Sequence, residues 1–182
     1  MGFHTFDVSR ADRLEDESRY RYVSVDELLA LFDPEGSVAD LGSGTGFYTD
    51  DVAPYVERVY AVDVQAEMHD YYRGKGAPGN VEFVTAAVAD LPFEEGALDA
   101  AFSTMTFHEF GDGAALAEIA RVLADGGRLG IADWSARGAG ESGPPLDERY
   151  ALSEAVALAE GAGLTVEHGS ERRETFVLRA VG

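Results

Sequence analysis

Residues 38–49 read Val-Ala-Asp-Leu-Gly-Ser-Gly-Thr-Gly-Phe-Tyr-Thr, an apolar run that contains an aspartate and is followed by glycines at alternate positions. The glycines allow the chain to turn sharply and bring bare backbone against a ligand. A helix that starts here would offer unpaired N–H groups and the positive end of its dipole, which suit an anionic group. The stretch therefore predicts a loop that binds a nucleotide-type cofactor. The contacts predicted from it are Asp40, Gly42, Ser43, Gly44, Thr45 and Gly46.

The spacing of the glycines separates two kinds of cofactor loop. A dinucleotide-binding loop needs G-x-G-x-x-G, but here the third glycine comes one residue early and Phe47 stands where that motif needs Gly or Ala. Asp40 lies at the sheet edge where open α/β sheets bind ligands, and its carboxylate favours a cationic amine. The combination D-x-G-x-G-x-G resembles the first motif of class I S-adenosylmethionine-dependent methyltransferases. The alternative is an ordinary strand-to-helix turn.

The composition limits the classes of protein to consider. The chain has 182 residues, the size of one ordinary domain. It carries 34 acidic against 14 basic residues, and Lys75 is its one lysine. This balance is typical of proteins that work in concentrated salt, with acidity for solubility alone as the alternative. It disfavours a nucleic-acid partner. The chain has no cysteine, which excludes disulfides and thiolate chemistry. With no signal peptide or membrane-length apolar stretch in view, we expect a cytoplasmic protein with no membrane partner.

Short apolar or β-branched runs alternate with helix-like stretches, the pattern of parallel strands joined by crossover helices. We expect strands near residues 37–41, 57–63, 80–84, 97–103, 127–133, 164–169 and 174–181. Helices are expected near residues 24–32, 47–56, 65–73, 113–124 and 151–161. The charged turn at 170–173 predicts that the last two strands form a hairpin. The resemblance implies the Rossmann-like class I methyltransferase fold, an α/β domain over residues 1–182. Its sheet would be mostly parallel and seven-stranded, with a C-terminal antiparallel hairpin and helices on both faces.

Two segments outside this pattern also resemble small methyltransferases related to the enzymes of ubiquinone and menaquinone biosynthesis. They are His4-Thr5-Phe6-Asp7 with Arg19, Arg21 and Tyr22, and Gly143-Pro144-Pro145-Leu146. The resemblance implies that a helical N-terminal segment, residues 1–33, caps the cofactor site, with simple surface placement as the alternative. Residues 135–150 form the one long loop, either a lid on the substrate side or a solvated connector.

Two further acidic residues follow predicted strands. Asp63 ends a strand, where its carboxylate can accept both hydroxyls of a ribose, although it could instead cap the next helix. Asp90 follows the third strand in Ala89-Asp90-Leu91, and the resemblance implies that this segment holds an adenine ring. The resemblance also implies cofactor contacts at Val64, Met68 and Thr104.

The segment 101–110 ends the fourth strand and enters a loop at the edge that, in the family it resembles, faces the transferring methyl group. His108 is the candidate general base, because imidazole titrates near neutral pH and can accept a proton from a hydroxyl or an acidic carbon. A histidine that only caps or packs is the alternative, and Glu109 either orients it or is simply exposed. We see no carboxylate cluster with metal-ligand spacing and expect no metal.

We therefore expect a methyltransferase that uses S-adenosylmethionine and a small-molecule acceptor. A nicotinamide-dependent oxidoreductase is less favoured: Tyr71-x-x-x-Lys75 resembles the pair of short-chain dehydrogenases, but glycines flank the lysine at a helix end. A module that binds the cofactor without turnover is a third alternative. The acceptor, the methylated atom and the oligomeric state stay open.

Overall fold

A computed structural model describes residues 6–182, so His4 and Thr5 of the N-terminal resemblance lie outside the described residues. The chain forms one seven-stranded sheet in the order β3-β2-β1-β4-β5-β7-β6. The strands are β1 Ser37–Leu41, β2 Arg58–Asp63, β3 Val81–Thr85, β4 Leu98–Thr104, β5 Leu123–Trp134, β6 Thr165–Glu171 and β7 Thr175–Val181. The first five pair in parallel, whereas β7 pairs antiparallel to both β5 and β6. The predicted fold class is confirmed.

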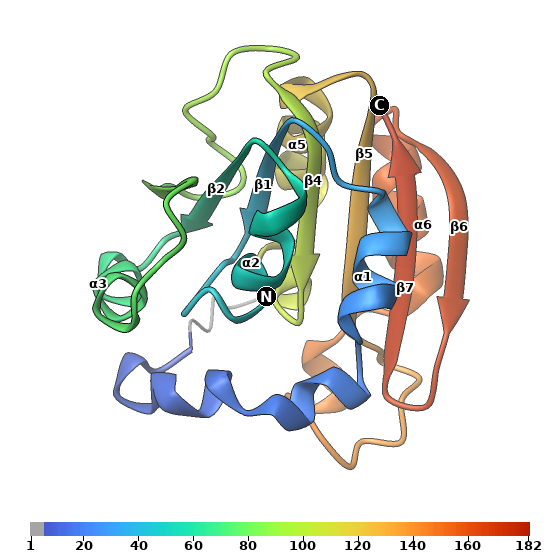
Figure 1. Cartoon of the computed structure of the whole chain (residues 1–182). Helices are drawn as coiled ribbons and strands as arrows, with labels where there is room; N and C mark the ends of the chain where they lie inside the picture. Colours follow the sequence, from blue (N-terminus) through green and yellow to red (C-terminus); the bar gives the residue numbers. More distant parts are fainter. Residues whose placement is uncertain (1–5) are drawn as a thin grey trace.

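Helices cover both faces of the sheet (Figure 1). The α-helices are α1 Val25–Phe32, α2 Phe47–Val52, α3 Ala66–Lys75, α4 Phe107–Phe110, α5 Gly113–Val122 and α6 Leu152–Gly161. Short 3-10 helices are η1 Val8–Glu15, η2 Glu17–Arg21, η3 Ala53–Tyr55 and η4 Leu146–Glu148. In Figure 1, α1 and α2 lie in front of the sheet and α5 and α6 behind it. No helix in residues 6–182 is long and apolar enough to cross a membrane.

The central strands β1 and β4 are mostly apolar and mostly buried, as expected for strands covered on both faces, with Asp40 of β1 a buried exception. In β1, Val38 packs into the cluster with α1 and α2, while Ala39 and Leu41 pack into the cluster with α5 and α6. The sheet is therefore packed between two hydrophobic cores, one on each face. They fix the carboxyl ends of β1, β2 and β4 at one edge, which is where the cofactor loop was expected.

The structure corrects two boundaries. Residues 107–110, expected in a loop, form the short helix α4, so His108 is held on a helical turn. The helix expected to reach residue 124 ends at Val122, because Leu123 already pairs with Leu98 of β4. The positive φ of Gly126, +76°, then turns the chain within the stretch assigned to β5.

The N-terminal segment crosses below the carboxyl edge of the sheet (blue in Figure 1), near the 135–150 loop. Tyr22 joins the two: its ring packs on Trp134 at a centroid distance of 4.8 Å and its hydroxyl donates to Ser142 Oγ at 2.7 Å. The N-terminal segment and the loop at 135–150 thus together cover the edge at which the loop after β1 lies.

Candidate functional site

The loop after β1 adopts a conformation that its glycines make accessible. Gly42 and Gly46 have φ of +80° and +78°, in the left-handed region that L side chains rarely adopt. A Cβ on Gly42 would lie 2.3 Å from the Thr106 methyl carbon, and one on Gly46 would lie 2.1 Å from the Tyr72 ring. Both glycines are therefore required by space as well as by backbone angle. The loop leads into α2, whose first turn begins at Phe47.

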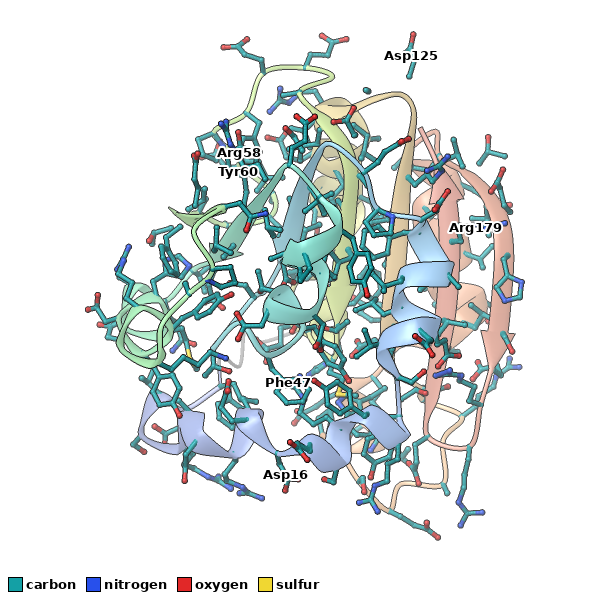
Figure 2. The ribbon with its side chains drawn as sticks, viewed as in Figure 1. Asp16, Phe47, Arg58, Tyr60, Asp125 and Arg179 are labelled. Atoms are coloured by element: carbon teal, nitrogen blue, oxygen red, sulfur yellow. The ribbon has the colours of Figure 1, made fainter. Side chains whose placement is uncertain are left out.

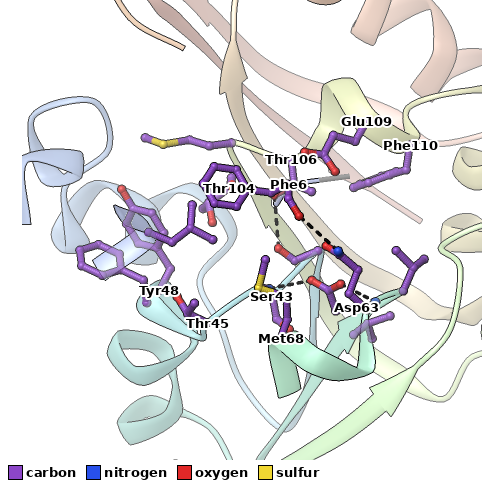
Figure 3. Close-up of a pocket in the computed structure, with 18 of the residues that line it drawn as sticks. Phe6, Ser43, Thr45, Tyr48, Asp63, Met68, Thr104, Thr106, Glu109 and Phe110 are labelled. Atoms are coloured by element: carbon purple, nitrogen blue, oxygen red, sulfur yellow. Dashed lines mark hydrogen bonds between the residues drawn. The ribbon is translucent and has the colours of Figure 1, made fainter. Parts of the chain in front are cut away.

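This loop forms part of a first cavity, drawn in Figure 3. Eight predicted cofactor contacts line it: Gly42, Ser43, Gly44, Thr45, Asp63, Val64, Met68 and Thr104. Further lining residues include Phe6, Leu14, Arg19, Tyr48, Val62, Ala86, Val88, Met105, Thr106 and Glu109. The structure thus brings residues from the ends of β1, β2 and β4 into one chamber, and adds the N-terminal segment as a wall.

Asp63 lies at the end of β2 and accepts hydrogen bonds from two backbone N–H groups, while the N-cap position of α3 itself is Gln65. Its Oδ2 accepts the backbone N–H of Gly44 at 2.9 Å, and its Oδ1 accepts that of Gln65 at 2.9 Å. Each carboxylate oxygen can accept more than one hydrogen bond, so both can still receive a ligand hydroxyl. The Gly44 contact also ties the glycine loop to β2. Ribose binding by Asp63 stays a prediction that this geometry allows.

The first cavity fits the expected cofactor in its chemistry. Ser43 Oγ and Thr45 Oγ1 are buried and have no hydrogen-bond partner among the described residues, so both can pair with a polar ligand. Buried Met68 and Val88 add apolar surface that suits a flat ring. A polar end and an apolar end in one chamber match a nucleoside joined to a charged amino-acid chain.

Asp40 lies beside the first cavity without lining it. Its carboxylate is buried, and Oδ2 accepts the Thr49 hydroxyl of α2 at 2.6 Å. Its Oδ1 has no partner among residues 6–182. Burial raises the pKa of Asp40 to about 7, although the hydrogen bond from Thr49 acts to lower it. The amine contact predicted for Asp40 stays a prediction, and the contact seen is with α2.

The segment after β3 approaches the cavity through other residues than those predicted. Asp90 and Ala89 are exposed, and neither they nor buried Leu91 lines the first cavity. Leu91 instead donates its backbone N–H to Glu118 Oε1 at 2.9 Å. Ala86 and Val88, a few residues earlier, supply the lining. The predicted adenine contacts at 89–91 therefore stay predictions. Gly46 also lies off the lining, packed against Tyr72.

A second cavity adjoins the first. Its lining residues are Phe6, Asp7, Arg10, Arg13, Leu14, Arg19, Met105, His108, Glu109, Trp134, Gly143, Pro144, Asp147 and Glu148. Five of them, Phe6, Leu14, Arg19, Met105 and Glu109, line the first cavity as well. Met105 stands at this junction with a φ of +57°, a strained conformation for a residue with a side chain. The two cavities are thus adjacent and share part of their lining.

His108 opens on the second cavity and is held by Asp133 at the end of β5. Asp133 is fully buried, and its oxygens lie 3.0 and 3.1 Å from His108 Nδ1. The same carboxylate accepts the His108 backbone N–H at 2.6 Å. An acceptor on Nδ1 favours the tautomer with Nδ1–H, which leaves the lone pair on Nε2. The arrangement is that of a base oriented by a buried acid.

The charge of this pair is set by burial and by its carboxylates. Burial lowers the pKa of His108, but the charge and hydrogen bond of Asp133, with the charge of Glu109, outweigh burial and leave the pKa raised. Burial raises the pKa of Glu109 to about 7. Glu109 Oε1 lies 4.0 Å from His108 Nε2. Glu109 can therefore exchange a proton near neutral pH, beside a His108 ring whose pKa lies above its ordinary value.

The loop at 135–150 is fastened to the molecule where it passes the second cavity. Arg149 is buried and donates to the carbonyl of Pro144 at 2.8 Å and to that of Ser142. Glu174 lies 3.5 Å from its guanidinium. Gly143 and Pro144 consequently form a wall of the second cavity, so this part of the loop is not a wholly solvated connector.

Site residues that escaped the sequence analysis include Asp133, Trp134, Arg10 and Arg13, of which the first two had a signal in the sequence. Asp133 and Trp134 end β5, and the topology places that end beside the end of β4. An acidic residue at the carboxyl end of a parallel strand is the signal that could have found Asp133, as it did Asp63. No group of three or more histidines and carboxylates in the described part of the chain could hold a metal.

Comparison with known proteins agrees with this geometry. A family model described as a methyltransferase domain matches residues 39–131, just over half of the chain. A crystal structure of a SAM-dependent methyltransferase from Aquifex aeolicus superposes with a TM-score of 0.86 at 31% identity, over 97% of this chain and 99% of that one.

Curated relatives match the same region. A methyltransferase-like protein of Schizosaccharomyces pombe is 34% identical over 108 residues, 59% of this chain and 41% of its own. Demethylmenaquinone methyltransferase of Corynebacterium kroppenstedtii is 36% identical over 103 residues, 56% of this chain and 43% of its own. The chain thus covers less than half of the length of each of these two relatives.

Proposed function

The chain belongs to the S-adenosylmethionine-dependent methyltransferases, and we propose that it methylates a small molecule that binds in the second cavity. The observation that carries this proposal is the junction of the two cavities, with His108 and Asp133 on the second. A cofactor in the first cavity would then have its acceptor directly beside it. The covered edge would exclude water from both.

S-adenosylmethionine supplies a methyl group on a sulfonium, which is already electrophilic. The first task of the chain is therefore to hold the two reactants in line. On the cofactor side, the residues for this are Asp63 and the hydroxyls of Ser43 and Thr45, which line the first cavity. On the acceptor side, Met105 and Trp134 provide apolar surface.

The second task is to remove a proton from the acceptor. His108 Nε2 accepts it from a hydroxyl or an acidic carbon as that atom attacks, and the buried Asp133 carboxylate stabilises the imidazolium through Nδ1–H. The raised pKa of His108 makes it a stronger base than a free imidazole once it is neutral. Turnover should therefore increase as pH rises through that pKa.

The test measures binding and turnover separately. Calorimetry with S-adenosylhomocysteine, in high-salt buffer, reports the first cavity, and release of S-adenosylhomocysteine from S-adenosylmethionine over a panel of metabolites reports transfer. Asp63→Ala should weaken binding about tenfold or more, because it removes a charged acceptor. His108→Gln should keep binding within about twofold and lower turnover about a hundredfold, the usual contribution of a general base.

The matched control is His168→Gln, an exposed histidine on β6 that should change neither quantity. Binding of S-adenosylhomocysteine without turnover on any acceptor would reject methylation and favour a binding module. Turnover retained in His108→Gln would reject the role of this histidine.

A further inference from the structure

The arginines on the second cavity differ from most others of the chain in having no carboxylate partner. The chain carries 34 acidic residues against 14 basic ones, so acids are available everywhere. Most basic side chains lie within 4.0 Å of a carboxylate. Among the described residues, five arginines make no such ion pair: Arg10, Arg13, Arg19, Arg21 and Arg137. Three of these five, Arg10, Arg13 and Arg19, line the second cavity.

Arg10 and Arg13 both belong to η1, but the periodicity of a helix does not relate them. The segment is kinked at Arg10, whose φ of −116° and ψ of 16° are not helical, so the evidence that they share a side is the cavity that both line. Both line the second cavity and neither lines the first. Both are exposed, so their guanidinium groups can reach a ligand without leaving a partner.

Arg19 extends this basic wall toward the junction with the first cavity. Its guanidinium lies 5.0 and 5.1 Å from the ring centres of Phe47 and Tyr48, and it donates to the Leu14 carbonyl at 2.6 Å. These contacts fix its position but leave its charge without a counterion among residues 6–182. Because Arg19 lines both cavities, an anion from either side could pair with it, and the argument therefore depends on Arg10 and Arg13.

Four acids also line the second cavity, and among the described residues none forms an ion pair within 4.0 Å with Arg10 or Arg13. Hydrogen bonds from Ser9 lower the pKa of the Asp7 carboxyl, and the charge of Arg10 adds to this effect. Asp7 Oδ1 accepts from the backbone and hydroxyl of Ser9, at 3.0 and 2.8 Å. Glu109 lies beside His108. Asp147 and Glu148 are on η4, the wall contributed by the loop, with no ion pair to η1. The N-terminal wall thus carries three arginines, Arg10, Arg13 and Arg19, against one lining acid, Asp7.

The apolar part of the cavity lies near this wall. Trp134 is the single tryptophan of the chain and is 9% exposed, with Met105 and Pro144 on the same lining. A guanidinium pairs with a carboxylate through two hydrogen bonds in a fixed geometry. The Trp134 ring is packed by Tyr22, at a centroid distance of 4.8 Å, and by Arg149, 5.6 Å from the ring centre, so only its remaining exposed part, with Met105 and Pro144, offers surface to an apolar body. One ligand can satisfy both.

We propose that the second cavity binds an amphipathic organic anion, whose charged group pairs with Arg10 and Arg13 and whose apolar body lies against Trp134. As a statement about the methyl acceptor, this rests on the proposed function. As a statement about binding, it is independent of turnover. The class of acceptor is an aromatic or similarly apolar molecule with a carboxylate or comparable anionic group.

The experiment compares two fluorescent probes that share their rings and differ in charge. Anilinonaphthalene sulfonate carries a sulfonate, and N-phenyl-1-naphthylamine lacks it. Binding is followed by quenching of Trp134, at the lowest salt concentration that keeps the protein folded, because salt screens the pairing. The anionic probe should bind with one site per chain and about tenfold more tightly than the neutral probe.

The variants assign the difference to the two arginines. The double variant Arg10→Gln/Arg13→Gln should weaken the anionic probe about tenfold and leave the neutral probe within twofold. The control Arg137→Gln/Arg179→Gln makes the same change of net charge outside the cavity and should leave both probes unchanged. Circular dichroism checks that each variant is folded.

Equal affinity for the two probes, no binding of the anionic probe, or no effect of the double variant would each overturn the proposal. The anion-site proposal and the proposed function can be rejected independently of each other. Charge discrimination without any turnover would sustain the anion site and reject methylation. Turnover of neutral acceptors that is unchanged in Arg10→Gln/Arg13→Gln would sustain methylation and reject the anion site as the place where the acceptor binds.

Discussion

Asp133→Asn is the substitution that most directly tests how His108 is controlled. The variant keeps the shape of the side chain but removes a charge 3.0 Å from His108 Nδ1. The Asn oxygen can still accept the His108 backbone N–H, now 2.6 Å from Asp133 Oδ2. Its amide nitrogen then faces Nδ1 as a donor, which favours the other tautomer and turns the lone pair away from the second cavity.

The size of the effect follows from the causes of the present shift. Burial, the largest single cause, lowers the pKa of His108, and Asp133 reverses that effect. A carboxylate in contact with a titrating group shifts its pKa by about 1–3 units. In Asp133→Asn we expect the pKa of His108 to fall by about that amount and to end below its usual 6.5, since burial is then opposed chiefly by Glu109. This equals about 1.4–4 kcal/mol of lost preference for the charged ring.

The same change predicts how stability depends on pH. A histidine with a raised pKa stabilises the fold most when it is protonated in both states, below its unfolded pKa, and this contribution is lost as pH rises through the folded pKa. The free energy of unfolding of the wild type should therefore fall relative to Asp133→Asn as pH rises above about 6.5. Denaturant titrations of both proteins at several pH values measure this difference.

The pKa and the tautomer are read from nitrogen-15 spectra of the imidazole rings. The His108 signals are assigned with His108→Gln, and His69 serves as the internal control. That ring lies 3.2 Å from Thr85 Oγ1 and makes no ion pair with a described residue. Glu109→Gln should lower the pKa of His108 less than Asp133→Asn, because Oε1 is 4.0 Å away. A His108 pKa that is unchanged or higher in Asp133→Asn would refute the reasoning.

Three further predictions concern the loop, the buried acid and the surface. Gly46→Ala should cost about 2–5 kcal/mol in denaturant unfolding, from its φ of +78° and the clash with Tyr72, whereas Gly74→Ala, with nothing near its Cβ, should stabilise by about 0.5–1 kcal/mol. The pKa of Asp40, about 7, implies that the free energy of unfolding of Asp40→Asn rises by up to about 4 kcal/mol relative to that of the wild type as pH rises from 4 to 8. If denaturant titrations give the same difference between the two proteins at pH 4 and at pH 8, this prediction is wrong. The net charge of −20 predicts that the midpoint of thermal unfolding rises with KCl concentration, by about 2–4 °C per kcal/mol gained. A flat calorimetric midpoint from 0.1 to about 2 M KCl would reject salt adaptation.

The acidic surface that motivates the last prediction has a simple geometry. Asp16 and Asp125 project from opposite ends of the molecule, and both are exposed (Figure 2). Exposed ion pairs such as Arg58 with Glu82, at 3.1 Å, contribute little, so they do not offset the general repulsion. Screening by salt is then the main way in which the repulsion between the acidic side chains is reduced.

The sequence predicted the sheet well because each strand is a short apolar run with turn residues at its ends. Such local patterns survive in the fold, since both faces of β1 and β4 are buried. Errors arose where tertiary contacts decide a boundary. Leu123 has helical neighbours, yet its pairing with Leu98 ends α5 at Val122. No periodicity in the sequence could reveal that pairing.

The first cavity was also largely predictable, because its contacts follow strand ends in order along the chain. Its floor at Gly42–Thr45 and its edge at Asp63 come from single motifs. Asp90 was harder to place, because its position depends on a turn after β3. In this turn the Asp90 N–H donates to the Ala87 carbonyl at 3.0 Å, and the Asp90 side chain is exposed. The order of motifs gave the strand, but not which side chains face the chamber.

The second cavity could not be predicted, and the reason bears on what the fold leaves free to vary. It is assembled from η1, the end of β5 and the 135–150 loop, which are far apart in the sequence and share no pattern. His108 and Glu109 were found because they follow a strand end, and the family resemblance pointed to Arg19 and to the segments 4–7 and 143–146, but nothing pointed to Arg10 or Arg13. Strand ends supply much of the first cavity, whereas two surface segments, η1 and the 135–150 loop, form most of the second, which is the proposed acceptor site. Acceptor choice should therefore reside in residues such as Arg10 and Arg13, and replacing them should change which molecule binds while S-adenosylhomocysteine binding stays constant.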